Sequence, residues 1–294
     1  MRLLLAVDSV LTAEMLMNSV ASRPWPRGTR ARVISVVEDD AVPEEVWREA
    51  GYKVDAVWQE MRRRGEQIAA FTVGPLRQLG IEAEVAIMRG DPQWLITYEA
   101  RKWPADLILI RAHNRTDFRS WMLGSVAKTV VRDAPCSVEV VRAAGDDLSV
   151  VGNGHMKILL ATDGSEHSVA AARAVAERPW PEGTEVKVMS MVNPLVYSME
   201  EMGLFETGGT RRAHRAIGDA AQIIAGAGVK TSAEVIAGRP DRRIAREAKE
   251  WGADLIVVGT EDRRGLRRLL SRSVSERVAS SAPCSVEVVR RARR

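Results

Sequence analysis

Short apolar runs alternate with segments of helical periodicity along the first half of the chain. Residues at helical spacing predict helices from about Thr12 to Ser22 and from about Glu44 to Leu79, and further helices that begin at Asp91 and near Ser125. The apolar runs have the length and composition of buried parallel strands, and they cover residues 2–9, 31–39, 82–90, 105–110 and 137–141. Strands that alternate with helices imply right-handed crossovers, so an α/β fold with a parallel sheet covered on both faces is expected.

The same pattern is present twice. The nine residues APCSVEVVR at 134–142 recur letter for letter at 282–290, which is an offset of 148. Near the start of each copy the offset is 155, as between Asp8 and Asp163. Seven residues are therefore missing from the second copy, and the matches place the gap inside its second helical region. Self-similarity at a fixed period indicates one structural unit made twice, which we call the first copy and the second copy.

The repeat divides the 294 residues into two domains. We expect the first domain over residues 1–144, a linker rich in glycine and polar residues over 145–156, and the second domain over 157–294. Each copy is long enough to bury a core of its own.

Composition narrows the class of protein. Hydrophobic residues make up 46% and charged residues 28%, as in ordinary soluble globular proteins, and a net charge of +4 gives only weak support to a nucleic-acid partner. No apolar run approaches the roughly 20 residues of a membrane span, and the run at the N-terminus is too short for a signal peptide. A cytoplasmic protein without a membrane partner is expected.

Cysteine and histidine residues give no sign of a metal centre. Cys136 and Cys284 occupy matched positions and are expected to be small buried hydrophobes. The four histidines show no paired ligand spacing, and no nucleophile elbow or Walker-type loop is present. No metal and no enzymatic activity are therefore predicted.

The tryptophans are interpreted as packing residues. Trp25 and Trp180 lie in matched Pro-Trp-Pro turns. The long predicted helix over Glu44–Leu79 carries one apolar stripe with charged residues between its members, and Gly80 is expected to end it. The stripe consists of Trp47, Val54, Val57, Trp58, Met61, Ile68 and Phe71.

Candidate chemistry lies where the parallel strands end, because ligands of open parallel sheets bind beyond the carboxyl ends of the strands. In each copy three places should meet there: the turn after the first strand, the end of the second strand, and the helix start after the fourth strand. Acids at Asp8 and Asp163 and serines at Ser125 and Ser273 occupy the first and third places. A serine at a helix start suits an anion site, but an ordinary helix N-cap explains it equally well, as a strand-end cap explains each acid.

Both copies resemble the universal stress protein family, and the whole chain resembles its tandem form. The matching features are DGS after the first strand, a GRP or GDP turn after the third, ADLIVVG in the fourth, Ser-Val at the next helix start, and APCSVEVV. The resemblance implies two Rossmann-like, five-stranded parallel sheets of the adenine nucleotide alpha hydrolase-like type. It also implies that residues 137–141 and 285–289 pair across an internal pseudo-twofold, so that one chain forms a pseudo-dimer, with a further homodimer left open.

Some members of that family bind ATP, and the resemblance implies corresponding residues here. In the second copy they are Asp163 at the ribose or adenine, Met191 and Val258 beside adenine, and Gly259, Ser273 and Val274 on the phosphate side. In the first copy they are Asp8, Val36, Gly124 and Ser125.

Both copies depart from the family's glycine-rich loop, which has the form G-x2-G-x9-G-[ST]. The second copy keeps Gly259 and Ser273 but has Asp262 and Arg272 at the other two glycines. The first copy has Arg111 and Asn114 in place of the first two glycines and keeps Gly124 and Ser125. A carboxylate about 4 Å from a phosphate costs about 4 kcal/mol at an effective dielectric constant of 20, so Asp262 disfavours a triphosphate.

Three hypotheses follow. The first is a stress-response regulatory or interaction protein, with an unidentified protein partner and no required cofactor, whose ATP loops are degenerate. The second is an ATP-binding sensor that uses the second copy, with slow hydrolysis as one variant; arginines within Arg263–Arg272 would then hold the phosphates. The third is a nucleic-acid binder that uses the same Arg263–Arg272 cluster, although a solvated basic loop explains that cluster too.

Overall fold

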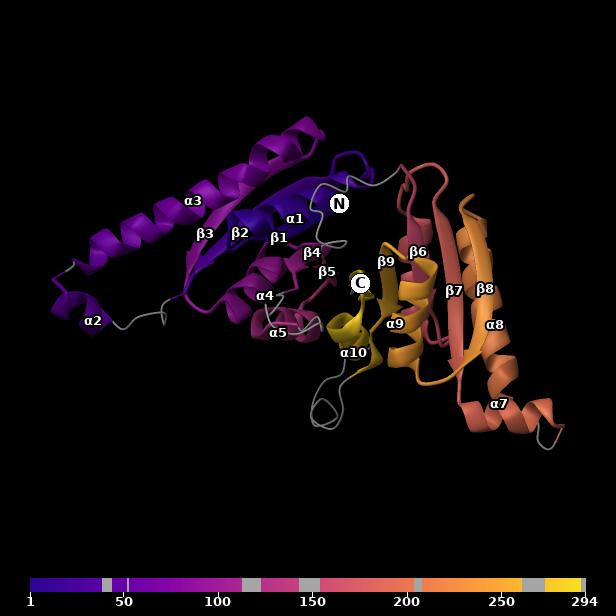
Figure 1. Ribbon diagram of the computed structural model, residues 1–294. Helices are drawn as coiled ribbons and strands as arrows, with labels where there is room; N and C mark the ends of the chain where they lie inside the picture. Colours follow the sequence, from indigo (N-terminus) through magenta and orange to yellow (C-terminus); the bar gives the residue numbers. More distant parts are fainter. Residues whose placement is uncertain are drawn as a thin grey trace.

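The computed structural model describes residues 1–38, 44–51, 53–112, 123–142, 154–203, 208–260 and 273–291. Their strands form one ten-stranded sheet in the order β3-β2-β1-β4-β5-β10-β9-β6-β7-β8 (Figure 1). The order is the same from either end when β1–β5 are matched with β6–β10. The two predicted five-stranded parallel sheets are therefore confirmed, and the missing residues of the second copy leave the strand order unchanged.

The elements of the first copy follow the predicted alternation. They are β1 (Arg2–Ala6), α1 (Val10–Ala21), β2 (Arg30–Val37), α2 (Glu44–Glu49), α3 (Val54–Gln78), β3 (Glu82–Arg89), α4 (Pro92–Lys102), β4 (Leu107–Arg111), α5 (Ser125–Asp133) and β5 (Ser137–Val141).

The second copy repeats this order. Its elements are β6 (Lys157–Ala161), α6 (Glu166–Ala176), β7 (Glu185–Val192), α7 (Pro194–Glu201), α8 (Gly209–Ala225), β8 (Lys230–Ala237), α9 (Pro240–Trp251), β9 (Leu255–Gly259), α10 (Val274–Ser281) and β10 (Ser285–Val289). Helix α8 has 17 residues where α3 has 25, which places the gap in the predicted region.

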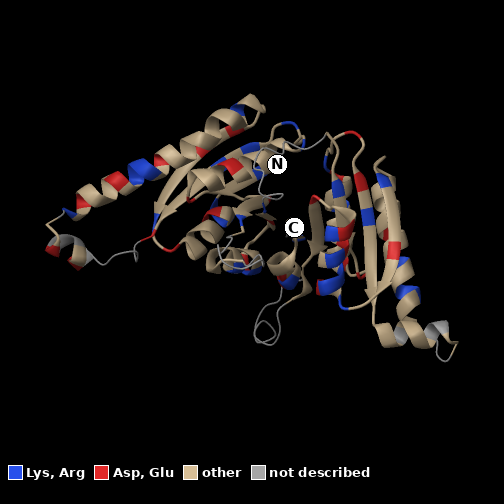
Figure 2. Cartoon of the chain, in the orientation of Figure 1, with Lys and Arg blue, Asp and Glu red and all other residues tan. Residues whose placement is uncertain are grey.

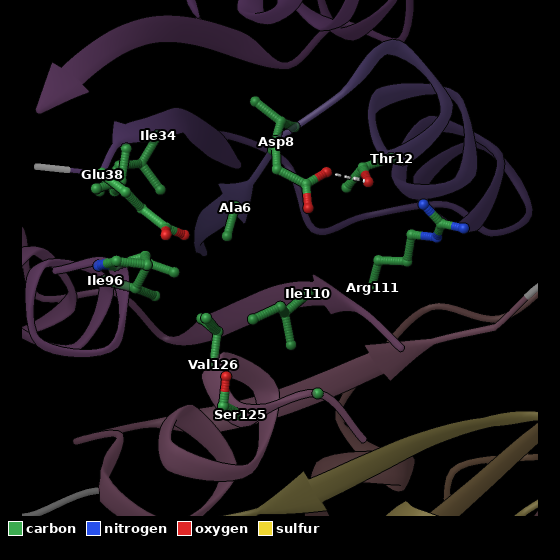
Figure 3. A pocket seen from close by; sticks show the side chains of 14 residues that line it. Ala6, Asp8, Thr12, Ile34, Glu38, Ile96, Ile110, Arg111, Ser125 and Val126 are labelled. Carbon is green, nitrogen blue, oxygen red and sulfur yellow. Dashed lines mark hydrogen bonds between the residues drawn. The ribbon is translucent and has the colours of Figure 1, made fainter. Parts of the chain in front are cut away.

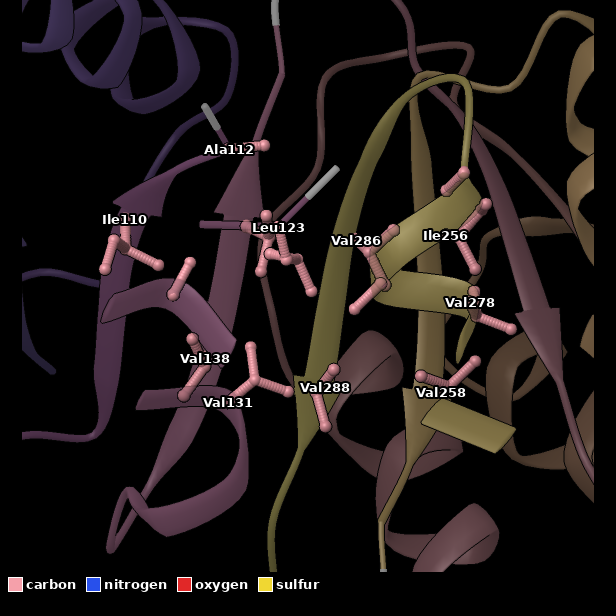
Figure 4. Packing of buried hydrophobic residues seen from close by; sticks show 14 of the residues in the cluster. Ile110, Ala112, Leu123, Val131, Val138, Ile256, Val258, Val278, Val286 and Val288 are labelled. Atoms are coloured by element: carbon pink, nitrogen blue, oxygen red, sulfur yellow. The ribbon is translucent and has the colours of Figure 1, made fainter. Parts of the chain in front are cut away.

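Helices cover both faces of the sheet, and three cores result. Residues of α1 and α3 pack on one face of the first copy, and residues of α6 and α8 pack on the matching face of the second. The third core, formed under α4, α5, α9 and α10, is continuous between the copies, with Val138 and Val131 near Val286 and Val288 (Figure 4).

The prediction of a single helix over Glu44–Leu79 is wrong, because the structure has two helices there. Helix α2 ends at Glu49, Gly51 has a left-handed φ of 79°, and α3 begins at Val54. The predicted stripe lies on the inner side of α3, where Val54, Val57, Trp58, Met61 and Ile68 are half-buried, but Phe71 is an exception because its side chain is exposed. The residues of α3 that are buried are Gly65, Ala69, Thr72 and Leu76. Small residues lie against the sheet there because the helix approaches it closely; a Cβ at Gly65 would lie 3.4 Å from the Ser35 hydroxyl oxygen.

The two copies join through β5 and β10, as the resemblance implies. The strands pair antiparallel, with Glu139 opposite Glu287. Arginines that follow the strands reach across the pseudo-twofold in the same way: Arg142 donates to the carbonyl of Ala279 at the end of α10, and Arg290 donates to the carbonyl of Val131 in α5 at 2.6 Å. Each arginine thereby satisfies helix carbonyls of the other copy that would otherwise lack a partner.

Buried ion pairs lie at the centre of this interface. Glu139 and Glu287 are 0% and 1% exposed although they sit in the middle of apolar strands. The Glu139 carboxylate is bound by Arg23 and by the Ser19 hydroxyl, and the Glu287 carboxylate is bound by Arg178. Sequence analysis did not identify these pairs.

The Pro-Trp-Pro turns serve packing, as predicted. The indole N–H of Trp25 donates to the carbonyl of Val20 at 2.8 Å, and that of Trp180 donates to the carbonyl of Val175 at 2.7 Å. The Arg23 guanidinium lies 4.7 Å from the Trp25 ring and 5.6 Å from the Trp180 ring, so it contacts aromatic rings of both copies.

Both cysteines are expected to resist thiol reagents in the native protein. Both residues are partly buried rather than fully buried as predicted, and this burial raises the pKa of the Cys136 and Cys284 thiols to about 12, so only about 0.01% of each is thiolate at pH 8. Ellman's reagent should therefore label both thiols slowly at pH 8 and rapidly after unfolding in guanidinium. A native thiol that reacts at the rate of free cysteine would contradict this placement.

Candidate functional site

Each copy has a cavity where its strand order switches direction. In the first copy the chain places β2 and β3 on one side of β1 and places β4 and β5 on the other; β6 and β9 mark the same point in the second copy. The cavities, called the first-copy pocket and the second-copy pocket, lie beyond the carboxyl ends of these strands. This is where open parallel sheets bind ligands.

The second-copy pocket has a volume of about 510 Å³ and a lining of mixed chemistry. Its apolar residues are Ala161, Met191, Pro240, Ile244, Val258 and Val274. Its hydroxyl residues are Thr162, Ser165, Ser168, Thr260, Ser273 and Ser275. The remaining lining residues are Asp163, Glu166, His167 and Gly259. Such a cavity suits a small molecule with a flat apolar part and several polar groups.

Asp163 adds a negative charge to this pocket. Its carboxylate accepts the backbone N–H of Ser165 at 3.0 Å, in the turn before α6. Burial alone would raise the pKa of the carboxyl, but hydrogen bonds from Ser165 and Ser168 lower the pKa below its usual value. The group is therefore ionised at neutral pH, which suits an acceptor of ribose hydroxyls and repels phosphate.

Ser273 is the N-cap of α10. Its hydroxyl accepts the backbone N–H of Glu276 at 3.1 Å and lies 2.9 Å from the Ser275 hydroxyl. Ser273 therefore acts as a helix cap in the second copy, which is the alternative to an anion site. In the first copy Ser125 is the first residue of α5, and the N-cap is Gly124, which has no side-chain hydrogen bond to offer.

Gly259 has a packing reason to be glycine. A Cβ there would lie 2.4 Å from the carbonyl oxygen of His167 and 2.7 Å from the backbone nitrogen of Ser168. The end of β9 therefore touches the first turn of α6, and no side chain fits between them. Glycine at this position is required by the fold whether or not a phosphate binds nearby.

The first-copy pocket is smaller, about 280 Å³, and mostly apolar. Its polar residues are Asp8, Thr12, Glu38, Arg111 and Ser125 (Figure 3). The Asp8 carboxylate accepts the Ser9 hydroxyl at 2.9 Å and also the Thr12 hydroxyl. Arg111 stands where the second copy has Gly259.

The ten predicted site residues converge on these two cavities. Asp163, Met191, Val258, Gly259, Ser273 and Val274 line the second-copy pocket, and Asp8, Val36, Gly124 and Ser125 line the first-copy pocket. Their role toward a nucleotide stays a prediction.

Sequence reasoning missed part of each lining. Pro92 and Ile96 of α4 and Pro240 and Ile244 of α9 also line the pockets, because the third strand–helix turn ends at the same edge of the sheet. The sequence does contain Asp91-Pro92 and Arg239-Pro240, which are typical of a turn at the start of a helix. Glu38 was missed as well, although it directly follows the second strand.

Several predicted features fall outside the described residues. They include Asp262, Asn114, the whole Arg263–Arg272 cluster and most of the linker over 145–156. In the described helices, basic residues are mixed with acids along α3 and α9 (Figure 2), as in the pairs Arg62–Glu66 and Arg246–Glu250. Mixed charges are typical of solvated helix faces and give no support to a nucleic-acid surface on these helices.

The described ranges show neither a metal site nor a membrane span. No group of three or more histidine, cysteine, aspartate or glutamate residues there could hold a metal ion. Among the same residues, no helix combines the length and the apolar character of a membrane span.

The comparisons with known proteins agree with this architecture. A family model described as the universal stress protein family matches residues 1–142 and 155–290. A universal stress protein of Mycobacterium tuberculosis is 27% identical over 97% of this chain and 95% of its own length. One from Thermus aquaticus is 35% identical over 45% of this chain and 97% of its own length. A crystal structure of a universal stress protein from Archaeoglobus fulgidus covers 99% of this chain and 96% of its own, with a TM-score of 0.67 at 20% identity, which shows a shared fold.

Proposed function

The chain belongs to the universal stress protein family as a tandem member, and from that premise we propose a cytoplasmic regulatory protein that does not depend on tight ATP binding. We propose further that it acts through another protein and catalyses no reaction.

The charge of the second-copy pocket carries this proposal. Its lining includes Asp163 and Glu166, and no lysine or arginine within the described residues. Glu166 pairs with Arg291 at 2.5 Å, whereas Asp163 has no cation as a partner among the described residues, so its charge opposes phosphate groups that bind in the same pocket. Each phosphate charge about 4 Å from a carboxylate costs about 4 kcal/mol at an effective dielectric constant of 20.

The pocket fits the nucleoside part of ATP better than its phosphates. Met191, Ile244 and Val258 offer the apolar contact that a base needs, and Asp163 offers an acceptor for ribose hydroxyls. The Ser273 hydroxyl is already engaged with α10. These features support weak binding of adenosine derivatives.

A thermal-shift titration with ATP and magnesium tests the proposal. At about 1 mM ATP and a dissociation constant of about 1 mM or weaker, linkage stabilises the folded chain by no more than about 0.4 kcal/mol. The unfolding midpoint should therefore stay nearly constant. A rise of several degrees in the unfolding midpoint would refute the proposal.

The second candidate is an ATP sensor that uses the second-copy pocket. It is favoured by one observation: six residues implied by the family resemblance line a cavity of about 510 Å³. Residues 261–272, which contain five arginines, join two residues of that lining, Thr260 and Ser273. On this candidate nucleotide copurifies with the protein, and Asp163→Ala or Ser273→Ala abolishes the thermal shift. A purified chain free of nucleotide and without a saturable site would rule it out.

A further inference from the structure

The first-copy pocket has its own chemistry. Residues of β1, β2, β4, α4 and α5 surround it, and most of them are apolar: Ala6, Val7, Ile34, Val36, Pro92, Ile96, Ile110 and Val126. The cavity of about 280 Å³ holds a molecule of roughly the size of a substituted benzene ring.

The lining of the first-copy pocket includes one cationic side chain, Arg111, that has no partner among the described residues. Its Nε is buried and has no hydrogen-bond partner, and among the described residues the side chain makes no hydrogen bond or ion pair. Buried N–H groups of proteins are nearly always bonded, and an unpaired one costs free energy. A guanidinium left open at the edge of a cavity indicates an anionic group as its missing partner.

Two differences between the copies make room for this arginine. In the second copy the β9 position of Gly259 has no space for a Cβ against α6. In the first copy α1 begins at Val10, two residues after Asp8, whereas α6 begins at Glu166, three residues after Asp163. The turn before the helix is thus one residue shorter in the copy that carries the arginine side chain.

The carboxylates of the pocket restrict the ligand's charge. Asp8 is engaged by the hydroxyls of Ser9 and Thr12. Glu38 lies on the opposite side of the cavity from Arg111 (Figure 3). Asp8 lies beside Thr12 on the same side of the cavity as Arg111 (Figure 3), so an anionic group is favoured only where the Arg111 guanidinium is nearer to it than the Asp8 carboxylate, and a chain of phosphates would bring further negative charges toward the two acids.

We propose that the first-copy pocket binds a small organic molecule with an apolar body and one acidic group, a carboxylate or a phosphate monoester, held by Arg111. The apolar body lies against Ile34, Ile96 and Ile110. The backbone N–H groups at the start of α5, whose N-cap is Gly124, lie beside the same cavity and favour the same charge. This site is separate from the second-copy pocket, so the proposal stands independently of the proposed function.

Titration of the full-length chain with phenylacetate and with phenyl phosphate tests the proposal, with 2-phenylethanol as the uncharged control. Saturation-transfer NMR should give saturable binding of at least one acid, with a dissociation constant on the order of 1 mM. Binding of phenylacetate alone or of phenyl phosphate alone assigns the acidic group. Arg111→Gln should weaken binding at least tenfold, Arg111→Lys less, and Arg77→Gln, an exposed arginine of α3, should leave it unchanged.

Four outcomes would contradict binding of an acid at Arg111. No saturable binding of either acid up to about 20 mM, about twentyfold above the expected dissociation constant, would overturn the proposal. So would equal binding of 2-phenylethanol, or binding that survives Arg111→Gln in a chain whose circular dichroism shows that it is folded. Loss of binding in Asp163→Ala with retention in Arg111→Gln would assign the acid to the second-copy pocket and refute the proposal.

Discussion

Arg23→Met is expected to lower the free energy of unfolding by about 3–5 kcal/mol, because it leaves a buried carboxylate without its cation. Glu139, its partner, is 0% exposed and lies opposite Glu287 in the β5–β10 pair. Without Arg23, the Glu139 carboxylate keeps the hydroxyl of Ser19 at 2.6 Å as its remaining described side-chain contact. Urea unfolding of the full-length chain at pH 7, followed by circular dichroism, measures the loss.

Two control variants separate the buried charge from the loss of a side chain. Arg23→Met combined with Glu139→Leu removes both charges, and this double variant should recover most of the lost stability because apolar replacements of buried ion pairs are well tolerated. Arg30→Met breaks the exposed pair with Glu82 and should leave the urea midpoint almost unchanged. If Arg23→Met is no more costly than Arg30→Met, the buried cluster does not stabilise the interface.

Gly259→Ala should destabilise the second copy by about 3 kcal/mol, at the upper end of the cost of overpacking. The added methyl group would lie 2.4 Å from the His167 carbonyl oxygen, and its neighbours are backbone atoms of α6, which cannot turn aside as a flexible side chain can. Urea unfolding again gives the change in free energy.

Gly218→Ala is the matched control for that experiment. Gly218 is exposed within α8, and a Cβ there meets nothing within 4 Å. Alanine has the higher helix propensity, so this variant should gain about 0.5–1 kcal/mol. Gly259→Ala that unfolds like the wild type would show that β9 and α6 are not in the described contact.

Much of the fold follows from local patterns and from the repeat. The strands were predictable because buried parallel strands are continuous apolar runs, and the identical SVEVV segments marked the joining strands. The sequence pattern did not show that α2 and α3 are two helices, because the pattern of charged residues continues across Gly51. The exposure of Phe71 was missed for a related reason: periodicity finds an apolar side but not the distance at which a helix packs.

The sites were predictable in position and less so in chemistry. Parallel topology brings the strand ends together, so the lining residues followed from sequence and family resemblance. The Arg23–Glu139 and Arg178–Glu287 pairs needed the register of strands far apart in sequence. The open guanidinium of Arg111 depends on a turn that is one residue shorter than its counterpart, a difference whose consequence appears only in three dimensions.

Calorimetric titration of the full-length chain with magnesium ATP and, separately, with adenosine tests the central claim most directly. The second-copy pocket can hold a nucleoside, while its described lining presents Asp163 and no lysine or arginine toward the phosphates. ATP should therefore bind no more tightly than adenosine, with a dissociation constant of about 1 mM or weaker. ATP binding at about 10 μM or tighter, at least a hundredfold stronger than adenosine and lost in Asp163→Ala, would contradict the account.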